Sequence, residues 1–222
     1  MGRATTYIDR LAAEILDTVA RLTPGVRYFL GITGSPASGK STIAHELTTA
    51  VNRRVHGDVA VVVPMDGFHL PNKVLHERGL YSLKGIPDTF DAEGFVLLLE
   101  RLHESPYLTV RAPSFDHAKH DPVYEEIAIQ PSHRLIVVEG NYLLHDEPPW
   151  DRLRPLLDEV WYVDAPRGVT AQRLLERHMK AGRSREEAEK KIASTDIPNA
   201  GIIERTRPHA DRIIGPSNIS QS

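Results

Sequence analysis

The chain has 222 residues, of which 41% are hydrophobic and 26% are charged, so it is long enough to bury the core of one domain. Its formal charge of -3 at pH 7 gives no broad basic surface, and we therefore expect no nucleic-acid partner. There is no cysteine, which excludes disulfides, thiolate metal sites and cysteine nucleophiles.

The first segment, residues 1–24, is predicted to form an amphipathic helix that serves packing. Apolar residues recur at helical spacing from Ile8 to Leu22, and Thr-Pro-Gly at 23–25 then breaks the pattern. Charged residues are spread through the same stretch, so it resembles neither a secretory signal nor a membrane span. We therefore expect a cytoplasmic protein with no membrane association.

A strand, a loop and a helix are predicted to follow directly, at residues 26–32, 33–39 and 41–50. Further short apolar runs typical of buried parallel strands occur at 59–63, 135–138, 160–163 and 213–214. Strands separated by helix-length stretches favour an α/β fold. We expect a three-layer αβα sandwich around a mainly parallel sheet, with a ligand crevice at the carboxyl ends of the strands.

Two insertions are predicted to decorate this sandwich. Residues 108–112 and 125–129 are both strand-like, which indicates a small hairpin, and a basic helical segment at about 173–195 is interpreted as a lid. The last residues, 215–222, look like a loose tail. The whole chain, residues 1–222, is expected to form a single domain.

Residues 34–41 read Gly-Ser-Pro-Ala-Ser-Gly-Lys-Ser and match the phosphate-binding pattern G-x-x-x-x-G-K-[ST] in full, between a predicted strand and a predicted helix. Backbone N–H groups of such a loop, and the helix that follows, can hold the β-phosphate. Lys40 is predicted to bridge the β- and γ-phosphates, and Ser41 to bind Mg²⁺. We therefore expect ATP and Mg²⁺ as cofactors; the nucleotide-binding residues are Gly34, Ser35, Pro36, Ala37, Ser38, Gly39, Lys40, Ser41 and Thr42. A turn of this composition without a ligand is the alternative.

Two acidic residues are predicted to stand at strand ends. Asp66 follows the run at 59–63 and precedes Gly67, so its carboxylate can emerge into the crevice; we expect it to act as the general base and count it as a metal candidate. Glu139 ends the run at 135–138, where P-loop proteins place the acidic group that holds Mg²⁺. The two roles could be exchanged, and either carboxylate could instead close a turn or a strand.

Cations are concentrated in the segment 173–195. Arg173 and Arg177 are four residues apart, on one face of a predicted helix, and Arg183 follows them. Such cations can stabilise the charge that develops on a transferred phosphoryl group, so we expect all three to be catalytic. The alternative is an ordinary solvated helix, because acidic residues at 186–189 could pair with them.

Polar and aromatic residues are dense in two irregular stretches, and we expect these to select the acceptor. The candidate substrate residues are His69, Asn72, Tyr81, Phe90, Arg111, Phe115 and His117. A zinc site is disfavoured, because the histidines of these stretches lack a tight ligand spacing.

The order of these motifs along nearly the whole chain resembles the P-loop kinase superfamily of uridine kinase, phosphoribulokinase and bacterial pantothenate kinase. The likeness is carried by the phosphate-binding loop, Asp-Gly-Phe at 66–68 before Pro-Asn at 71–72, Pro-Ser-Phe-Asp-His at 113–117, Val-Glu-Gly at 138–140 and the arginine-bearing lid. Met-Asp-Gly-Phe-His at 65–69 is most similar to a bacterial group described as nucleoside kinase-like or fructose-transport kinase-like.

The resemblance implies a P-loop NTPase fold and a role for each matching residue. Asp66 corresponds to the catalytic base of the superfamily, Lys40 and Ser41 to its nucleotide and metal contacts, and Arg173, Arg177 and Arg183 to its lid cations. Members are frequently dimers or tetramers, so the resemblance is compatible with a homodimer.

Two classes of function fit these observations. The leading hypothesis is an ATP-dependent kinase that transfers the γ-phosphate to a hydroxyl of a small metabolite, such as a nucleoside, a pantothenate-like compound or a sugar. The alternative is a nucleotide-binding switch or NTP hydrolase module without a small-molecule acceptor. A guanine-specific Asn-Lys-x-Asp is missing, because Asn72-Lys73 is followed by Val74 and Leu75, which disfavours a GTPase switch.

Overall fold

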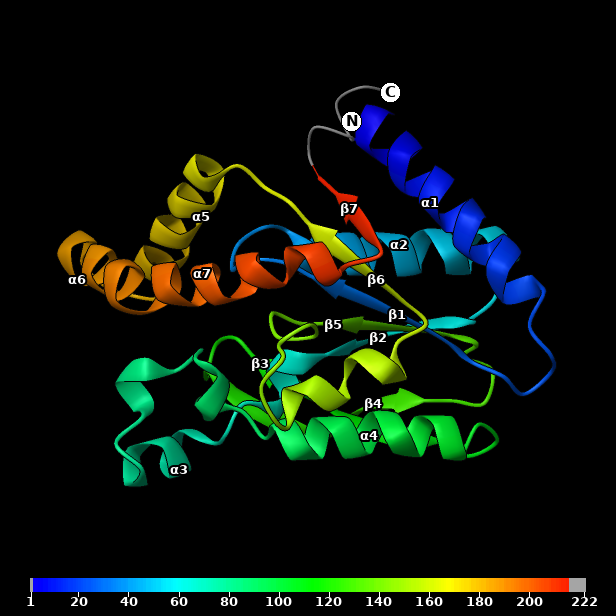
Figure 1. Cartoon of the computed structure of the whole chain (residues 1–222), viewed down its shortest axis with the longest axis horizontal. Coiled ribbons are helices and arrows are strands. Elements are labelled where there is room, and N and C mark those ends of the chain that lie inside the picture. The colour runs from blue at the N-terminus through cyan, green and yellow to red at the C-terminus, as the bar shows by residue number, and fades with distance from the viewer. Residues whose placement is uncertain (1, 216–222) are drawn as a thin grey trace.

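The computed structural model describes residues 2–215, with side chains described from Tyr7 onward. Its centre is a five-stranded sheet in the order β2-β5-β1-β6-β7, and every neighbouring pair runs parallel (Figure 1). The strands are β1 (Tyr28–Thr33), β2 (Ala60–Pro64), β5 (Leu135–Glu139), β6 (Glu159–Val163) and β7 (Arg212–Ile214). The mainly parallel sheet expected from the sequence is confirmed.

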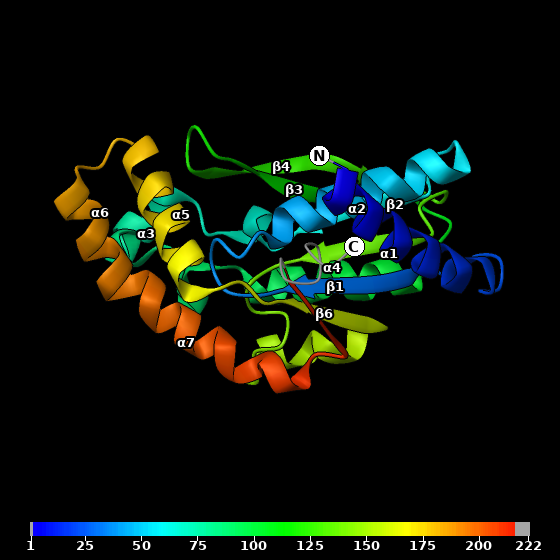
Figure 2. The same ribbon diagram turned by 90° about the horizontal axis from the view of Figure 1, so that it is seen from above.

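Helices cover the sheet on both faces, which completes the three layers. α1 (Gly2–Ala20) and α2 (Lys40–Val55) pack on one face, and α4 (Ala92–Glu104) and the hairpin of β3 and β4 lie on the other (Figures 1 and 2). Alternate strand residues supply the two cores: in β1, Leu30 joins the core under α1 and α2, whereas Phe29 joins the core under α4. The continuous apolar runs in the sequence are therefore strands buried on both faces.

The N-terminal helix packs as expected but is shorter than residues 1–24. Ile8, Leu11 and Ile15 are buried in the core that α1 shares with α2, and α1 ends at Ala20. β1 also begins later than expected. The carbonyl of Val26 accepts from the Arg134 side chain, and the first ladder hydrogen bond comes from Tyr28 N, 2.7 Å from Arg134 O.

The predicted hairpin is present and longer than its sequence signal. β3 (Val110–Asp116) pairs antiparallel with β4 (Asp121–Ile129), and the register shifts between Ala112 and Ser114. Pro113 lies at this irregularity, where a proline costs no ladder hydrogen bond. Because a proline is unfavourable in a strand pattern, the sequence predicted a strand that ends at residue 112, whereas β3 continues to Asp116.

Short helices fill the stretch between β2 and α4 that the sequence indicates as irregular. They are the turn Met65–Phe68, α3 (Asn72–Glu77) and the turns Tyr81–Leu83 and Pro87–Thr89. A bridge between His69 and Phe90 closes the stretch into a loop whose ends meet. We name this closed stretch, residues 65–90, the acceptor loop, because it contains the substrate candidates His69, Asn72, Tyr81 and Phe90.

The basic segment consists of helices whose bounds differ from the expected 173–195. They are α5 (Arg167–Lys180), α6 (Arg185–Lys191), the π-helical turn Ile192–Asp196 and α7 (Ile197–Thr206). They form an arm that extends beyond the ends of the strands in Figures 1 and 2. Of the tail expected at 215–222, residues 216–222 lie outside the described part of the chain. Within residues 2–215, no helix combines the length and the apolar character needed to cross a membrane.

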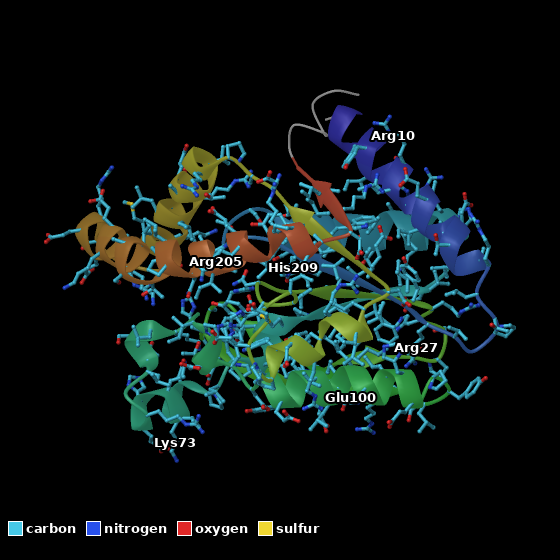
Figure 3. All side chains as sticks on the ribbon, viewed as in Figure 1. Arg10, Arg27, Lys73, Glu100, Arg205 and His209 are labelled. Atoms are coloured by element: carbon cyan, nitrogen blue, oxygen red, sulfur yellow. The ribbon has the colours of Figure 1, made fainter. Side chains whose placement is uncertain are left out.

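A buried arginine fastens the end of α4 to the hairpin side of the sheet. Arg27 is 6% exposed and donates to the carbonyls of Leu102, Pro106 and Gln130, at 2.9, 3.2 and 3.3 Å. Figure 3 places it beside the C-terminal end of α4. Loss of this guanidinium would leave buried carbonyls without a donor.

We expect Arg27→Ala to lower the free energy of unfolding by about 2–4 kcal/mol, because the buried carbonyls lose their partner. Chemical denaturation of the purified variant measures this. The matched control is Arg21→Ala, which removes an exposed arginine bound to Asp17 O and should change stability by less than about 0.5 kcal/mol. Equal effects of the two variants would contradict the assigned role of Arg27.

Candidate active site

The phosphate-binding loop connects β1 to α2 in the conformation that anion binding requires. Ala37 and Gly39 have φ of 62° and 100°, in the left-handed region, and Gly39 caps α2 without any side-chain hydrogen bond. The first N–H groups of α2 are therefore not covered by a capping side chain. A helix N-terminus in this state is suited to a phosphate.

Two further features of the loop fit a bound nucleotide. A Cβ at Gly34 would lie 2.6 Å from the carbonyl oxygen of Val163, so only glycine allows the loop to pass this close to β6. Ser38 is buried, and its Oγ has no hydrogen-bond partner. A buried hydroxyl without a partner is costly, and a ligand oxygen in the loop would satisfy it.

A buried carboxylate faces the loop from the neighbouring strand. Glu139 ends β5, its side chain is 7% exposed, and its Oε1 lies 3.7 Å from Lys40 Nζ. Burial raises the pKa of the Glu139 carboxyl to about 7, and Lys40 opposes this rise. The Ser41 side chain also lowers the pKa of Glu139, which places its hydroxyl near this carboxyl. A carboxylate and a hydroxyl are oxygen donors of the kind that Mg²⁺ accepts, so the residues present fit that ion.

Asp66 lies at the end of the adjacent strand. Pro64 pairs with Glu139 in the register of β2 and β5, and Asp66 follows two residues later. Its side chain is 41% exposed, and its charge adds to the rise in the pKa of Glu139. A Cβ at Gly67 would lie 2.4 Å from Pro113 O, so the turn holding Asp66 is packed directly on the hairpin. Both predicted carboxylates thus lie at the carboxyl ends of neighbouring strands.

An aromatic group stands next to Asp66. The ring of His69 packs on Phe90 at 4.0 Å and on Phe115 at 4.8 Å between centroids, and its Nδ1 lies 2.9 Å from the backbone oxygen of Asp66. Burial lowers the pKa of His69, so the ring is neutral at neutral pH with Nδ1–H as donor to that carbonyl. The structure therefore brings together the candidates His69, Phe90 and Phe115.

Asn72 and His117 extend this aromatic group together with Lys84, which belongs to the polar stretch recognised in the sequence but was not selected as a substrate candidate. Lys84 Nζ donates to Asn72 Oδ1 at 2.8 Å, and the His117 ring lies 5.3 Å from that of Phe115. Asp121 accepts the backbone N–H of Asn72 at 2.8 Å. A lysine in an irregular stretch carries no motif, so only the fold reveals this position.

Two other substrate candidates have their partners elsewhere. Tyr81 is 43% exposed and stacks on His76 of α3, with ring centroids 4.0 Å apart. Arg111 is exposed on β3 and donates to the carbonyl of Glu125 across the hairpin at 3.0 Å. Within the described part of the chain, neither side chain contacts Asp66 or the aromatic group of His69, Phe90 and Phe115.

The three lid arginines occupy different positions. Arg173 lies directly on the phosphate-binding loop, with its Nη1 3.2 Å from Ala37 O and 3.5 Å from Ser38 O. Its guanidinium would therefore be within reach of a phosphate in that loop. The sequence placed Arg173 and Arg177 on one helical face and predicted the same role for both. In the structure they have different partners.

Arg177 and Arg183 surround a buried pair that the sequence analysis did not assign. His178 Nε2 lies 2.7 Å from Asp196 Oδ2, and both residues are buried. Arg177 lies 3.9 Å from the same carboxylate, and Arg183 Nη1 is 3.3 Å from His178 Nδ1. This pair joins α5 to the π-helical turn and fixes the direction of both arginines.

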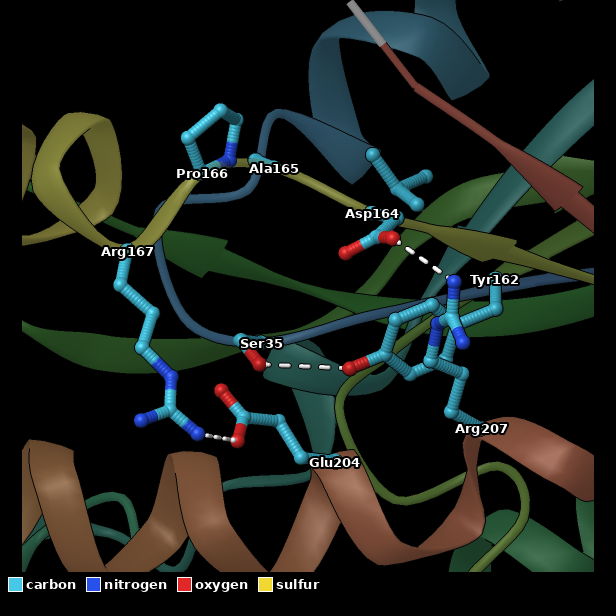
Figure 4. A pocket seen from close by; sticks show the side chains of 9 residues that line it. Ser35, Tyr162, Asp164, Ala165, Pro166, Arg167, Glu204 and Arg207 are labelled. Atoms are coloured by element: carbon cyan, nitrogen blue, oxygen red, sulfur yellow. Dashed lines mark hydrogen bonds and ion pairs between the residues drawn. The ribbon is translucent and has the colours of Figure 1, made fainter.

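A pocket of about 400 Å³ adjoins the phosphate-binding loop at Ser35, between the end of β6 and the C-terminal end of α7 (Figure 4). Two ion pairs lie along it, Arg167 with Glu204 at 2.6 Å and Arg207 with Asp164 at 2.9 Å. None of the acceptor candidates lines this pocket. The loop thus has polar surroundings on the side of α7 as well as on the side of Asp66.

Comparison with known proteins identifies the family. The model of the phosphoribulokinase / uridine kinase family matches residues 29–218. The chain belongs to this family. Its members are kinases, and with its complete phosphate-binding loop this member is an ATP-dependent small-molecule kinase whose acceptor group is a hydroxyl.

Individual members of the family are similar over most of their length. A candidate uridine kinase of Schizosaccharomyces pombe is 34% identical over 194 residues, which cover 85% of this chain and 83% of that protein. A pantothenate kinase of Leifsonia xyli is 30% identical over 230 residues, which cover 94% and 70%. A solved structure, a candidate fructose transport system kinase from Silicibacter sp. TM1040, has a TM-score of 0.83 at 34% identity and covers 93% and 98%. The P-loop kinase fold and the enzyme class expected from the sequence are confirmed.

The raised pKa of Glu139 gives this kinase a defined pH dependence of stability in the absence of ligands. Because the folded carboxyl holds its proton up to about pH 7 and the unfolded one only up to about pH 4.5, folding takes up a proton between these values. Its contribution to the free energy of unfolding therefore falls as the pH rises through this window. We expect Glu139→Gln to flatten that part of the stability profile, measured by chemical denaturation from pH 5 to pH 8. An unchanged profile would contradict the burial effect.

Proposed function

We propose that Asp66 is the general base and that Glu139 serves the metal in this kinase. The observation that carries this division is the difference in exposure: Asp66 is 41% exposed, whereas Glu139 is 7% exposed and 3.7 Å from Lys40. An acceptor hydroxyl can reach an open carboxylate, whereas a buried one next to the phosphate-binding loop suits a bound cation. The exchange of roles left open by the sequence is thereby disfavoured.

The proposed reaction is a direct phosphoryl transfer. Asp66 takes the proton of the acceptor hydroxyl, the hydroxyl oxygen forms a bond to the γ-phosphorus, and the bond from that phosphorus to the bridging oxygen of ADP breaks. Lys40 and the N–H groups at the start of α2 hold the phosphates that leave as ADP. Mg²⁺, bound by Ser41 and Glu139, would neutralise charge on the phosphate oxygens. The products are ADP and a phosphomonoester.

The lid arginines are proposed to stabilise the transferred group in two ways. Arg173, on the carbonyls of Ala37 and Ser38, is suited to contact the phosphates from the loop side. Arg177 and Arg183 are proposed to reach the γ-phosphate when the arm of α5 to α7 moves toward the loop. The twelve residues between Arg183 and Asp196 would move together with these two arginines as part of the lid.

The acceptor is proposed to lie against the wall formed by His69, Asn72, Phe90, Phe115 and His117. This placement is supported by the contacts of His69, which bonds to the backbone oxygen of Asp66 and packs on the rings of Phe90 and Phe115. The names of similar proteins, a candidate uridine kinase, a pantothenate kinase and a candidate fructose transport system kinase, support a small metabolite with a free hydroxyl. Tyr81 and Arg111 stay sequence predictions.

Residues 1–222 are proposed to act as one kinase domain, in support of which both cores share the strands of a single sheet. A cytoplasmic location is proposed because ATP is the phosphate donor. The absence of a nucleic-acid partner and the presence of a homodimer stay predictions from charge and from the family resemblance.

We expect Asp66→Asn to lower kcat for acceptor phosphorylation by about 10²–10⁴-fold, because the hydroxyl loses its base, with ATP binding retained. ADP release with Mg·ATP and a panel of nucleosides, pantothenate, sugars and sugar phosphates measures this, and Lys40→Ala serves as the blank. The matched control is Asp151→Asn, an exposed aspartate outside the site. Full activity of Asp66→Asn would contradict the base assignment.

A further inference from the structure

Lys84 is a cation without a counter-charge in the wall of the proposed acceptor site. Its Nζ donates to Asn72 Oδ1 at 2.8 Å and to the carbonyl of His120 at 2.6 Å, and it lies 5.1 Å from the centre of the Phe115 ring. Both hydrogen-bond acceptors are neutral. Among the described side chains, no carboxylate oxygen lies within 4.0 Å of this ammonium.

The surroundings of Lys84 withdraw it partly from water without pairing it with a carboxylate. Burial lowers the pKa of Lys84, and the more distant carboxylates of Asp121 and Asp66 only partly offset this. Charges that leave water are normally paired, because neutral oxygens restore only part of the lost hydration. Two of the three N–H donors of the ammonium have partners, so one is left for a ligand.

Other side chains face the same space from the hairpin tip and from the lid. Burial lowers the pKa of His120, and Lys84, Arg183 and His117 lower it further, which places these side chains in one electrostatic neighbourhood. Among the described residues, Arg183 has no carboxylate oxygen within 4.0 Å, and its Nη1 lies 3.3 Å from His178 Nδ1. The positive charge therefore comes from the acceptor loop and from the lid, and the hairpin places histidines beside it.

Lys191 joins the lid side of this group to the acceptor loop. Its Nζ donates to Ser82 O at 2.7 Å and to Lys84 O at 3.2 Å, which holds α6 against the backbone on which Lys84 stands. Arg183 and Lys191 also line one pocket of about 310 Å³ on α6. Lys191 of the lid thus contacts the backbone of Lys84 directly, and Arg183 lies on the same side of α6.

The group of cations is continuous with the proposed base. His69 contacts the backbone of Asp66 at 2.9 Å and the ring of Phe115 at 4.8 Å, and Lys84 lies on that same ring. A small acceptor whose hydroxyl is at Asp66 would therefore extend along His69 and Phe115 toward Lys84. The part of the acceptor at that end meets positive charge.

We propose that the acceptor of this kinase carries an anionic group, a carboxylate or a phosphate, which is bound by Lys84 with Arg183 at the edge of the site. The inference rests on the proposed function, because it requires the acceptor hydroxyl to be at Asp66. A neutral nucleoside or free sugar would leave the half-buried Lys84 without an anionic partner. An anionic acceptor supplies the missing counter-charge and selects against neutral analogues of the same shape.

The test uses pairs of compounds that differ in the anionic group: glycerate with glycerol, pantothenate with pantothenol, and fructose 6-phosphate with fructose. Binding is measured by calorimetry with Mg²⁺ and a non-hydrolysable ATP analogue at low and high salt, and phosphorylation by ADP release. We expect the anionic member of one pair to bind at least about 10-fold more tightly, with a preference that weakens in high salt. The carboxylate and phosphate pairs distinguish the two sources of charge.

Variants at Lys84 distinguish two roles of this residue: binding the charge of the acceptor, and holding Asn72 and the His120 carbonyl in place. We expect Lys84→Met to raise KM for the anionic acceptor by about 10- to 100-fold and to abolish its advantage over the neutral analogue, and Lys84→Arg to keep most of that advantage. Lys73→Met is the matched control, since Lys73 is an exposed lysine on α3 at the periphery of the molecule (Figure 3). A merely structural role would lower binding of both members of a pair equally.

The outcomes for the two proposals can be distinguished. Transfer to a neutral acceptor as effective as to its anionic analogue, or no binding of any anionic compound, would overturn the anionic acceptor. The same would follow if Lys84→Met kept the charge preference. Binding of an anionic compound that depends on Lys84, without phosphate transfer, would support the anionic site and contradict the proposed reaction.

Discussion

The contact between Lys40 and the buried carboxylate of Glu139 is the interaction on which the site depends. It joins the start of α2 to the end of β5, with the two side chains 3.7 Å apart, and Lys40 opposes the rise in the pKa of Glu139 that burial causes. Because β5 lies between β1 and β2 in the sheet, the strand order brings Asp66 and the phosphate-binding loop to the two sides of Glu139. The residues proposed for the nucleotide, the metal and the acceptor therefore lie at the carboxyl ends of the strands, as in other open α/β folds.

The arm of α5 to α7 is attached to the acceptor side through backbone oxygens. The carbonyl of Gly85 accepts from Tyr142 Oη at 2.6 Å and from Asn199 Nδ2 at 3.1 Å, and Lys191 holds the neighbouring carbonyls. The acceptor loop is thus coupled to the lid, whereas Arg173 contacts the phosphate-binding loop directly. An acceptor that orders residues 81–87 would act on the lid through these same bonds, which couples acceptor binding to the placement of the arginines.

Much of the fold and the phosphate-binding half of the site could be predicted because their signals are local. The loop at 34–41 has a fixed pattern, and the strands at 135–138 and 160–163 are continuous apolar runs, which buried parallel strands require. Element ends were less predictable. Pro113 hid part of β3, and the basic segment was interpreted as one lid although it consists of several helices around a π-helical turn.

The acceptor half could be predicted only in outline, because it depends on contacts between distant segments. Asp66 and His69 follow a strand and stand out in the sequence, but Lys84 becomes significant only when Asn72, Phe115 and His120 surround it. The pairing of His178 with Asp196 likewise joins two helices with no sequence signal. Long-range packing, rather than local pattern, decides which polar residues face the substrate.

Phosphorus NMR of the purified protein with Mg·ATP and the acceptors tests the central claim most directly, because it shows where the γ-phosphate goes. The account predicts a phosphomonoester signal that grows in step with ADP and is absent without acceptor. Inorganic phosphate in place of the ester, released at the same rate with or without acceptor, would contradict it and indicate an NTP hydrolase.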